Sequence, residues 1–159
     1  MGLLFLKKKI KLNNFLSKYF TNQYYMPSIR IKLVNHLSKF ANSSIDISDG
    51  LLSDLEKLIN NQKLSYKLNL RAIPISYNLK KVLQLKKLSK INFISKGDDY
   101  QILFTASQEK SGIIKKISSK LSVKITKIGI IQNKSLKSSI IEHNNVKITL
   151  KNKGYHHKF

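Results

Sequence analysis

Residues 44–54 have the sequence SIDISDGLLSD, and the hydrophobic period changes within them. Ile45 and Ile47 alternate with polar residues, as in a half-buried strand, whereas the leucines after Gly50 recur at the spacing of an amphipathic helix. The change falls at residues 48–50. This pattern predicts a short strand, a tight turn and the first turn of a helix.

Acidic residues are scarce in this chain and are concentrated in two places. Three of the eight acids lie in residues 44–54, and Asp98 and Asp99 lie together in residues 95–100, SKGDDY. The 30 basic residues are spread almost everywhere else. Acids scattered over a surface would not cluster in this way, so both segments are candidate functional sites.

The net charge of +22 suggests a polyanionic partner, because dense positive charge is favoured at phosphates by counterion release. However, Arg30 and Arg71 are the only arginines, and the planar guanidinium is the group that recognises phosphate or guanine in a bidentate manner. The abundance of lysine, asparagine and isoleucine is typical of an AT-rich genome. Composition therefore favours generic codon bias over a dedicated polyanion site, with only nonspecific binding of nucleic acid.

Length and composition also limit the class of protein. The chain has 159 residues, 42% of them hydrophobic, which fits one domain of usual size plus a short extra segment. It has no cysteine, which excludes disulfides and thiolate chemistry. Residues 1–6 are apolar and precede three lysines, whereas a signal peptide carries its charges first. No stretch approaches the ~20 apolar residues that span a bilayer. We therefore expect a soluble, cytoplasmic protein with no membrane partner.

Hydrophobic periodicity predicts both helices and strands along the chain. Ser28 and Ser76 precede apolar stripes at helical spacing and are predicted N-caps. The predicted helices are 2–12, 14–25, 28–41, 51–59, 76–83, 88–94 and 107–120. The predicted strands are 45–47, 65–74, 100–105, 123–129 and a C-terminal hairpin of 139–142 with 146–150.

The first acidic segment has the donor atoms of a metal and phosphate site. Asp46 leaves the predicted strand and Asp49 opens the predicted helix, so their carboxylates can converge in front of the sheet edge. Ser48 offers a hydroxyl group, and the free N–H groups of a helix N-terminus attract anions. Mg²⁺ prefers hard oxygen ligands, usually one or two carboxylates together with substrate phosphates.

Structural explanations stay open for these acids. Asp49 is explained equally well as an N-cap of the helix. Asp46 is harder to explain in this way, because an acid between two isoleucines gains nothing from strand propensity. Asp54 and Glu56 are expected on the solvated face of the helix.

The second acidic segment has an alternative explanation of the same kind. Gly97 is a possible helix C-cap, with Asp98 and Asp99 in a turn before a strand, and spacing supports this as well as it supports a site. Adjacent like charges repel, so a cation or a hydrogen-bond donor is expected nearby. His156 and His157 in the basic C-terminal segment are expected to be solvated rather than to bind metal.

Residues 46–51 have the pattern Asp-x-Ser-Asp-Gly-Leu, the most specific of several motifs. The others are residues 97–100, 103–105, 128–129 and 154–159. In their order and spacing, over nearly the whole chain, these motifs resemble the C-terminal part of thiamine-monophosphate kinase. The resemblance implies the superfamily of aminoimidazole ribonucleotide synthetase and selenophosphate synthetase. It also implies an α/β fold, a layered domain in which a mixed β-sheet is flanked by helices.

The resemblance further implies an activity, the ATP- and Mg²⁺-dependent phosphorylation of thiamine monophosphate to thiamine diphosphate. By the same resemblance, Asp46 and Asp49 bind Mg²⁺ and Ser48 contacts ATP. Asp98 and Tyr155 contact thiamine monophosphate. No nucleophilic residue is implied, because direct phosphoryl transfer depends on positioning and on neutralisation of charge.

The resemblance divides the chain after residue 26. Residues 1–26 are then the remnant of a helical segment between two domains, and residues 27–159 are the C-terminal domain. The family's N-terminal ATP-binding domain, which supplies most of the Mg²⁺ carboxylates and the dimer surface, is absent from this sequence. We therefore expect a fragment that is inactive alone and requires a separate N-terminal half, and the family's homodimer is less expected without that domain.

Three positions depart from the family pattern. Asp98 stands where the family has a glutamate, Gln101 stands where an acid is usual, and residues 154–159 replace an aspartate and add a residue. These departures leave the choice and affinity of substrate open. Two other functions agree with the sequence: another ATP-using member of the superfamily, or a noncatalytic lysine-rich domain that binds nucleic acid or other polyanions.

Overall fold

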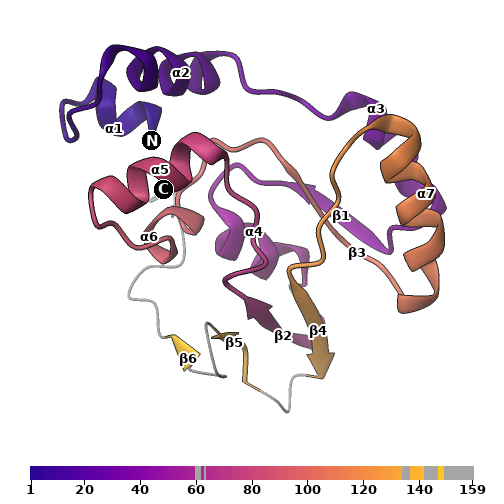
Figure 1. Ribbon diagram of the computed structural model, residues 1–159. Helices are drawn as coiled ribbons and strands as arrows, with labels where there is room; N and C mark the ends of the chain where they lie inside the picture. Colours follow the sequence, from indigo (N-terminus) through magenta and orange to yellow (C-terminus); the bar gives the residue numbers. More distant parts are fainter. Residues whose placement is uncertain (60–61, 63, 134–136, 142–146, 149–159) are drawn as a thin grey trace, which may run out of the picture.

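The computed structural model describes residues 1–59, 62, 64–133, 137–141 and 147–148. Figure 1 shows α4 near the centre of the molecule, with α1 and α2 over one end and α7 at the other. The helices are α1 (Gly2–Leu6), α2 (Asn14–Tyr25), α3 (Ile31–Val34), α4 (Leu51–Leu58), α5 (Tyr77–Leu85), α6 (Ile91–Ile94) and α7 (Ser111–Leu121), with 3₁₀ turns η1 (Leu37–Lys39) and η2 (Gln108–Lys110). The strands are β1 (Ser43–Asp46), β2 (Leu64–Asn69), β3 (Ile102–Thr105), β4 (Gly129–Asn133), β5 (Ser139–Ile141) and β6 (Lys147–Ile148).

These strands form two sheets. In the smaller sheet β1 pairs antiparallel with β3, and Asp46 lies opposite Ile102. In the larger sheet the order is β4-β2-β5-β6, and β2 pairs antiparallel with β4 but parallel with β5. The larger sheet is therefore mixed, and helices flank the sheets (Figure 1), which confirms the predicted α/β class. The division into two sheets is a feature that the prediction lacked.

Side-chain caps fix where two helices begin. At the start of α2, Oδ1 of Asn13 accepts the N–H of Leu16 at 2.9 Å. At the start of α5, Oγ of Ser76 accepts the N–H of Leu79 at 3.1 Å, which confirms the predicted cap. The bounds of α2 are also those that its periodicity predicts.

The predicted helix over residues 28–41 is wrong. This stretch contains one short turn of α-helix, α3, and one 3₁₀ turn, η1. Ile31 and Val34 are β-branched and exposed, so neither helix propensity nor burial supports a continuous helix. Leu33 and Phe40 are instead buried in a cluster with the apolar face of α7.

The predicted strand over residues 123–129 is also wrong in most of its length, because β4 begins at Gly129. Ser122 ends α7 in the left-handed conformation, with φ of 52°. Val123 and Ile125 then pack into the cluster around α7. The chain reaches the edge of β2 only at Gly129, so pairing starts there.

Two predictions concern the ends of the chain. The first helix stops at Leu6 rather than at residue 12, because Lys8 adopts the left-handed conformation, with φ of 55°, and interrupts the helix. The C-terminal hairpin is confirmed in its described part, because β5 pairs antiparallel with β6. The turn of this hairpin, residues 142–146, lies outside the described residues.

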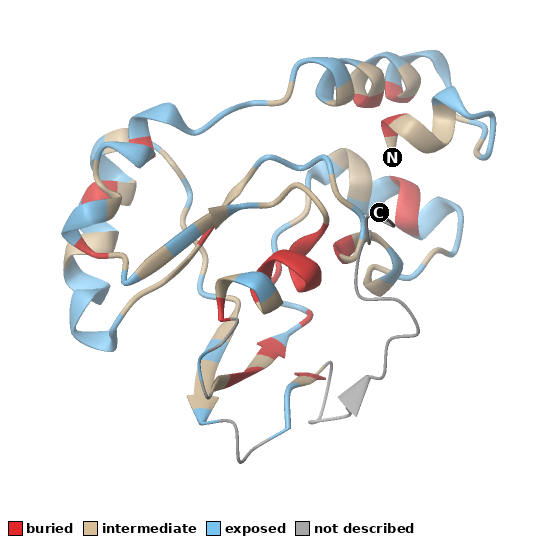
Figure 2. Ribbon diagram, turned by 180° about the vertical axis from the view of Figure 1, so that it is seen from behind, coloured by how far each residue is buried: buried red, intermediate tan, exposed pale blue. Residues whose placement is uncertain are grey.

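Three hydrophobic clusters hold the elements together, and the buried residues of α4 mark the largest of them in Figure 2. The largest cluster joins α4 to β2, β3 and α6. A second joins α2 to α5 and so packs residues 1–26 onto the rest of the chain, and a third surrounds α7. Their buried members are Leu51, Leu52, Leu55, Ile59, Tyr66, Leu68, Leu70, Ile73, Ile94, Leu103 and Ile140; then Leu16, Phe20 and Val82; then Leu33, Phe40 and Ile117.

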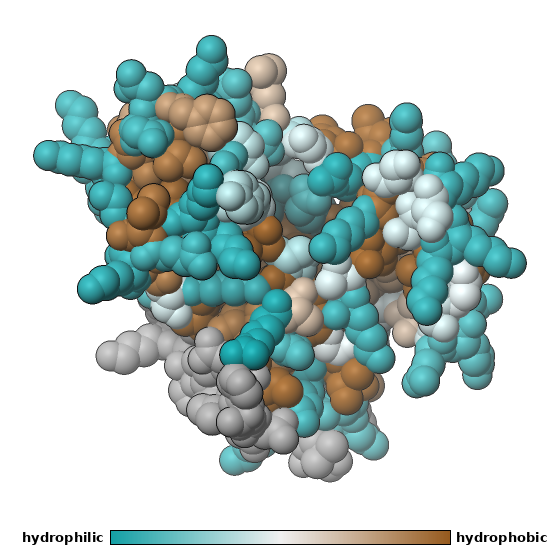
Figure 3. Space-filling view, viewed as in Figure 1, coloured by the Kyte–Doolittle hydropathy of each residue, from teal (hydrophilic) through white to brown (hydrophobic). Residues whose placement is uncertain are grey.

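The surface is strongly hydrophilic but carries apolar side chains. Figure 3 shows hydrophilic side chains projecting over much of one face, with apolar surface between them. The stretch from the end of α2 to the end of α3 holds large apolar side chains that are 51–71% exposed, namely Tyr25, Met26, Ile29, Ile31 and Val34. In the part of the chain that the structure describes, no helix is both long and apolar enough to cross a membrane.

We predict that Leu52→Ala lowers the free energy of unfolding by about 2–5 kcal/mol, because it opens a cavity in the largest cluster. Leu52 is 0% exposed, whereas Leu85 on α5 is 74% exposed. The matched variant Leu85→Ala should change stability by less than about 0.5 kcal/mol. Urea unfolding followed by circular dichroism measures both. Equal effects of the two substitutions would contradict the central position of α4.

Candidate functional site

The two acidic segments, 52 residues apart at Asp46 and Asp98, meet at one end of the smaller sheet. The pairing of β1 with β3 continues past the strands, since the N–H of Ile47 donates to the carbonyl of Gln101 at 2.9 Å. The N–H of Tyr100 donates back to the carbonyl of Ile47, and the N–H of Asp98 donates to the carbonyl of Ser48, both at 2.9 Å. Residues 47–50, the first loop, and residues 95–101, the second loop, therefore form one unit.

Glycines allow these two loops to pack backbone against backbone. A Cβ added to Gly97 would lie 1.8 Å from the carbonyl oxygen of Ser48. Gly50 has φ of +116°, and a Cβ added there would lie 2.8 Å from the carbonyl of Ser95. The alternative explanation of Gly97 as a helix C-cap is therefore wrong, because the C-cap of α6 is Ser95 and Gly97 is needed for the contact between the loops.

The backbone of the second loop adopts uncommon conformations. Asp98 has φ of 65° and Tyr100 has φ of 49°. Aspartate tolerates the left-handed region, but an aromatic residue occupies it only where surrounding contacts fix the chain. The hydrogen bonds from both N–H groups to the first loop supply those contacts.

Asp54 is a buried residue of this unit, although the sequence predicted it on the solvated face of the helix. Its side chain is 0% exposed, and its Oδ2 accepts the N–H groups of Ser48, Asp49 and Gly50 at 2.9, 2.9 and 3.2 Å. Its Oδ1 accepts Nζ of Lys57 at 2.8 Å. The first loop folds back over the start of α4, whose N-cap, Gly50, makes no side-chain capping hydrogen bond.

This contact limits how the first loop can bind an anion. The N–H groups of residues 48–50 donate to the carboxylate of Asp54. A phosphate group at the first loop would therefore have to bind through side chains or a cation rather than through these three amides.

The sequence contained a signal for the burial of Asp54. It follows Leu51 by three residues and precedes Leu55 and Leu58 on the same helical stripe, so it lies on the apolar face of α4. Its charge concealed that position. Glu56, also predicted on the solvated face, is half-buried, and its carboxylate accepts Oη–H of Tyr66 at 3.3 Å. Burial, followed by the charge of Glu56, raises the pKa of Tyr66 to about 12.

Lys57 links two of the carboxylates. Its Nζ donates to Oδ2 of Asp49 as well as to Oδ1 of Asp54. Hydrogen bonds to Asp49 and then to Asp54 raise the pKa of Lys57. The alternative explanation of Asp49 as an N-cap is wrong, because Gly50 occupies that position and the Asp49 carboxylate binds Lys57.

The remaining predicted site residues lie around this unit. Asp46, at the end of β1, and Asp98 are exposed, and Ser48 is half-buried. Tyr155 lies outside the described residues. Among the residues that the structure describes, no group of three or more His, Cys, Asp or Glu side chains is arranged to hold a metal ion. Asp46 and Asp49 are carboxylates of the type that Mg²⁺ prefers, an ion usually bound by one or two carboxylates together with phosphates and water.

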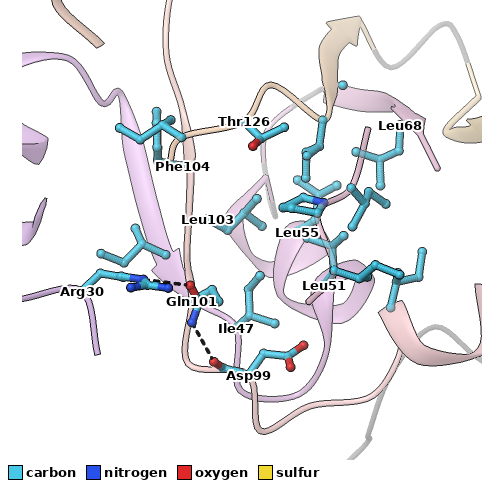
Figure 4. Close-up of a pocket in the computed structure, with 18 of the residues that line it drawn as sticks. Arg30, Ile47, Leu51, Leu55, Leu68, Asp99, Gln101, Leu103, Phe104 and Thr126 are labelled. Atoms are coloured by element: carbon cyan, nitrogen blue, oxygen red, sulfur yellow. Dashed lines mark hydrogen bonds between the residues drawn. The ribbon is translucent and has the colours of Figure 1, made fainter. Parts of the chain in front are cut away.

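The two loops open onto a cavity of about 2030 Å³. Figure 4 shows that Ile47, Leu51, Leu55 and Leu103 line it with apolar side chains, while Arg30 and Gln101 contribute polar groups. Nε of Arg30 donates to Oε1 of Gln101 at 3.2 Å, and Nε2 of Gln101 donates to the carbonyl of Asp99 at 3.3 Å.

Asp99 lines the cavity, although the residue as a whole is exposed. Desolvation beside the cavity raises the pKa of Asp99 to about 6. The amino group of Met1 opposes this rise, and the neighbouring carboxylate of Asp98 adds to it.

Comparison with known proteins was made over the whole chain. Thiamine-monophosphate kinase of Buchnera aphidicola subsp. Acyrthosiphon pisum is 34% identical over 158 residues, which cover 98% of this chain and 48% of that protein. The crystal structure of thiamine monophosphate kinase from Aquifex aeolicus matches with a TM-score of 0.70 and 25% identity, covering 92% of this chain and 46% of that one. The chain is a relative of the thiamine-monophosphate kinases. It spans about half the length of the curated relatives it matches.

Two further matches concern the fold and a second family model. AaThiL complexed with AMPPCP and TMP matches with a TM-score of 0.73 over 98% of this chain and 47% of that one, and at 24% identity this likeness shows the fold alone. A family model described as "Uncharacterized protein conserved in bacteria (DUF2129)" matches residues 74–138. That match covers α5 to β4 and leaves out the first loop. The relationship to thiamine-monophosphate kinase includes both loops.

We predict that Gly97→Ala destabilises the chain by about 1–3 kcal/mol, because the added methyl group meets the backbone of Ser48 and forces the two loops apart. Gly112, on α7, has nothing within 4 Å of an added Cβ and is the matched control. Gly112→Ala should be neutral or stabilise by up to about 1 kcal/mol, since alanine favours helix. Urea unfolding of both variants measures the difference, and equal stability would contradict the close packing of the loops.

We predict that Asp99 titrates with a midpoint near pH 6 in a carbon-13 NMR titration, above its ordinary value of 3.8. Because the folded state raises this pKa, the contribution of Asp99 to stability is fully present below pH 3.8 and is lost as pH rises through about 6. The free energy of unfolding of Asp99→Asn, relative to that of the unchanged chain, should therefore be higher at pH 7 than at pH 4. An unshifted midpoint would contradict desolvation of this carboxyl group.

Proposed function

We propose that this chain is half of an enzyme that transfers the γ-phosphoryl group of ATP to thiamine monophosphate, giving thiamine diphosphate. The observation that carries the proposal is the meeting of the two acidic loops at one cavity, in a chain that matches thiamine-monophosphate kinase over 98% of its length. The presence of AMPPCP and TMP in the AaThiL complex agrees with these two substrates.

Each proposed site residue has a role in this reaction. Asp46 and Asp49 would hold Mg²⁺ through carboxylate oxygens, the first exposed at a strand end and the second oriented by Lys57. Ser48 would contact ATP beside them, and Asp98 and Tyr155 would contact thiamine monophosphate. Mg²⁺ bound there would supply positive charge against the phosphate groups. No side chain of this chain has to act as a nucleophile, because direct transfer depends on positioning.

The domain organisation follows from the same proposal. Residues 1–26 would belong to a segment between two domains, and residues 27–159 would form the C-terminal domain. A separate N-terminal half would complete the metal and ATP sites, because the described residues hold no group of three or more His, Cys, Asp or Glu side chains arranged for a metal ion. The chain alone would then be inactive.

A noncatalytic domain that binds polyanions is the second candidate, and the net charge of +22 favours it. Hydrophilic side chains project over much of the face in Figure 3 rather than from one patch, which is the pattern of nonspecific attraction. Binding to DNA that persists at physiological salt would favour this candidate, whereas loss with modest added salt would leave only generic charge.

We predict that the chain, mixed with the N-terminal half of a related thiamine-monophosphate kinase, makes thiamine diphosphate from ATP, Mg²⁺ and thiamine monophosphate. Asp46→Asn should lower the rate by on the order of hundredfold, the scale for losing one group that stabilises transition-state charge. Chromatographic measurement of thiamine diphosphate gives both rates.

A matched acid-to-amide change serves as the control. Glu109→Gln, in the exposed turn η2, should leave the rate unchanged. Normal turnover of Asp46→Asn would refute the metal role, and an inactive mixture with a folded chain would refute the two-part enzyme.

A further inference from the structure

We infer that Asp54 is a positioning residue of the proposed site, acting through the first loop and through Lys57. The effect inferred for Asp54 on the binding of a divalent cation rests on the proposed function. The hydrogen bonds by which Asp54 holds the first loop do not depend on that proposal. Asp54 touches neither of the proposed substrates. It holds the residues that would.

The carboxylate of Asp54 is buried, and hydrogen bonds replace its lost hydration. Asp54 is 0% exposed and lies on the apolar stripe of α4 with Leu51 and Leu55. A buried carboxylate is unfavourable unless charge-assisted hydrogen bonds replace its lost hydration. Here four donors surround its two oxygens, three from the first loop and one from Lys57. An apolar residue would fill this place in the core but would leave the three amides without these acceptors.

Three consecutive backbone amides converge on the carboxylate of Asp54. The N–H groups of Ser48, Asp49 and Gly50 point to one oxygen, Oδ2, which fixes the backbone between β1 and α4. In this arrangement the carbonyl of Ser48 accepts the N–H of Asp98 in the second loop. One buried oxygen thus sets the path of the first loop, and through it the position of the second.

Asp54 also acts on the side chain of Asp49, through Lys57. Lys57 donates hydrogen bonds to Asp49 and to Asp54 at the same time, so the buried carboxylate of Asp54 holds the ammonium group beside Asp49. The side chain of Asp49 is 19% exposed, and that of Lys57 is 47% exposed. Asp54 therefore orients Asp49 in two ways, through its backbone N–H and through the shared lysine.

The test measures loop structure and metal binding separately on the full chain. In the unchanged chain, NMR hydrogen exchange of the Ser48, Asp49 and Gly50 amides should be as slow as that of the β1–β3 pairing. In Asp54→Asn these three amides should exchange about ten- to hundredfold faster, the effect of losing hydrogen bonds to a charged group. Amides of the β2–β4 pairing report that the variant is folded and should keep their rates.

The second readout uses Mn²⁺ alone as the probe, with free metal measured by electron paramagnetic resonance. Asp54→Asn should weaken binding about tenfold, as expected for a group that orients metal ligands. The matched control is Glu56→Gln, an acid-to-amide change two residues further along α4, which should alter neither the three amides nor the affinity.

The outcomes separate the inference from the proposed function. Fast exchange of the three amides in the unchanged chain, or equal exchange in Asp54→Asn, overturns the positioning role whether or not metal binds. Faster exchange with unchanged Mn²⁺ affinity also overturns it, because Asp54 would then only stabilise the fold. No Mn²⁺ binding by the unchanged chain, measured both alone and mixed with the N-terminal half of a related kinase, instead refutes the metal part of the proposed function and removes the consequence inferred for Asp54.

Discussion

The carboxylate of Asp54 is the interaction on which the arrangement of the site depends. It accepts hydrogen bonds from three backbone N–H groups of the first loop and from Nζ of Lys57, and its side chain is wholly buried. This contact turns the end of β1 into the start of α4 without a conventional side-chain cap. The second loop then rests on the first through backbone hydrogen bonds and a glycine contact.

The charge at this corner determines what it can bind. Asp46, Asp49, Asp98 and Asp99 gather where the two loops meet, and Lys57 is joined to Asp49. The three amides of the first loop already donate to Asp54. The carboxylates at this edge would repel a phosphate group, and a divalent cation bound between them would offset that repulsion. Under the proposed function, this chain would hold one side of such a site.

Sequence reasoning was successful where local patterns decide the structure. The change of period within residues 44–54, the cap at Ser76 and the bounds of α2 all depend on neighbours a few residues away. It failed where distant contacts decide. The need for glycine at residue 97 comes from the carbonyl of Ser48, and the break in residues 28–41 comes from packing against α7. Asp54 was misplaced because its charge was given more weight than its position on the apolar stripe.

The pairing of β2 affects how the chain folds. β2 is the first strand of the larger sheet in the sequence, and both of its partners, β4 and β5, come much later. The N–H of Tyr66, for example, donates to Oγ of Ser138, 72 residues away. Such distant pairing makes sheet formation slow, whereas α2 and α4 can form from local contacts. During synthesis β2 therefore presents two open edges until nearly the whole chain has emerged, and this is the period in which self-association competes most strongly with folding.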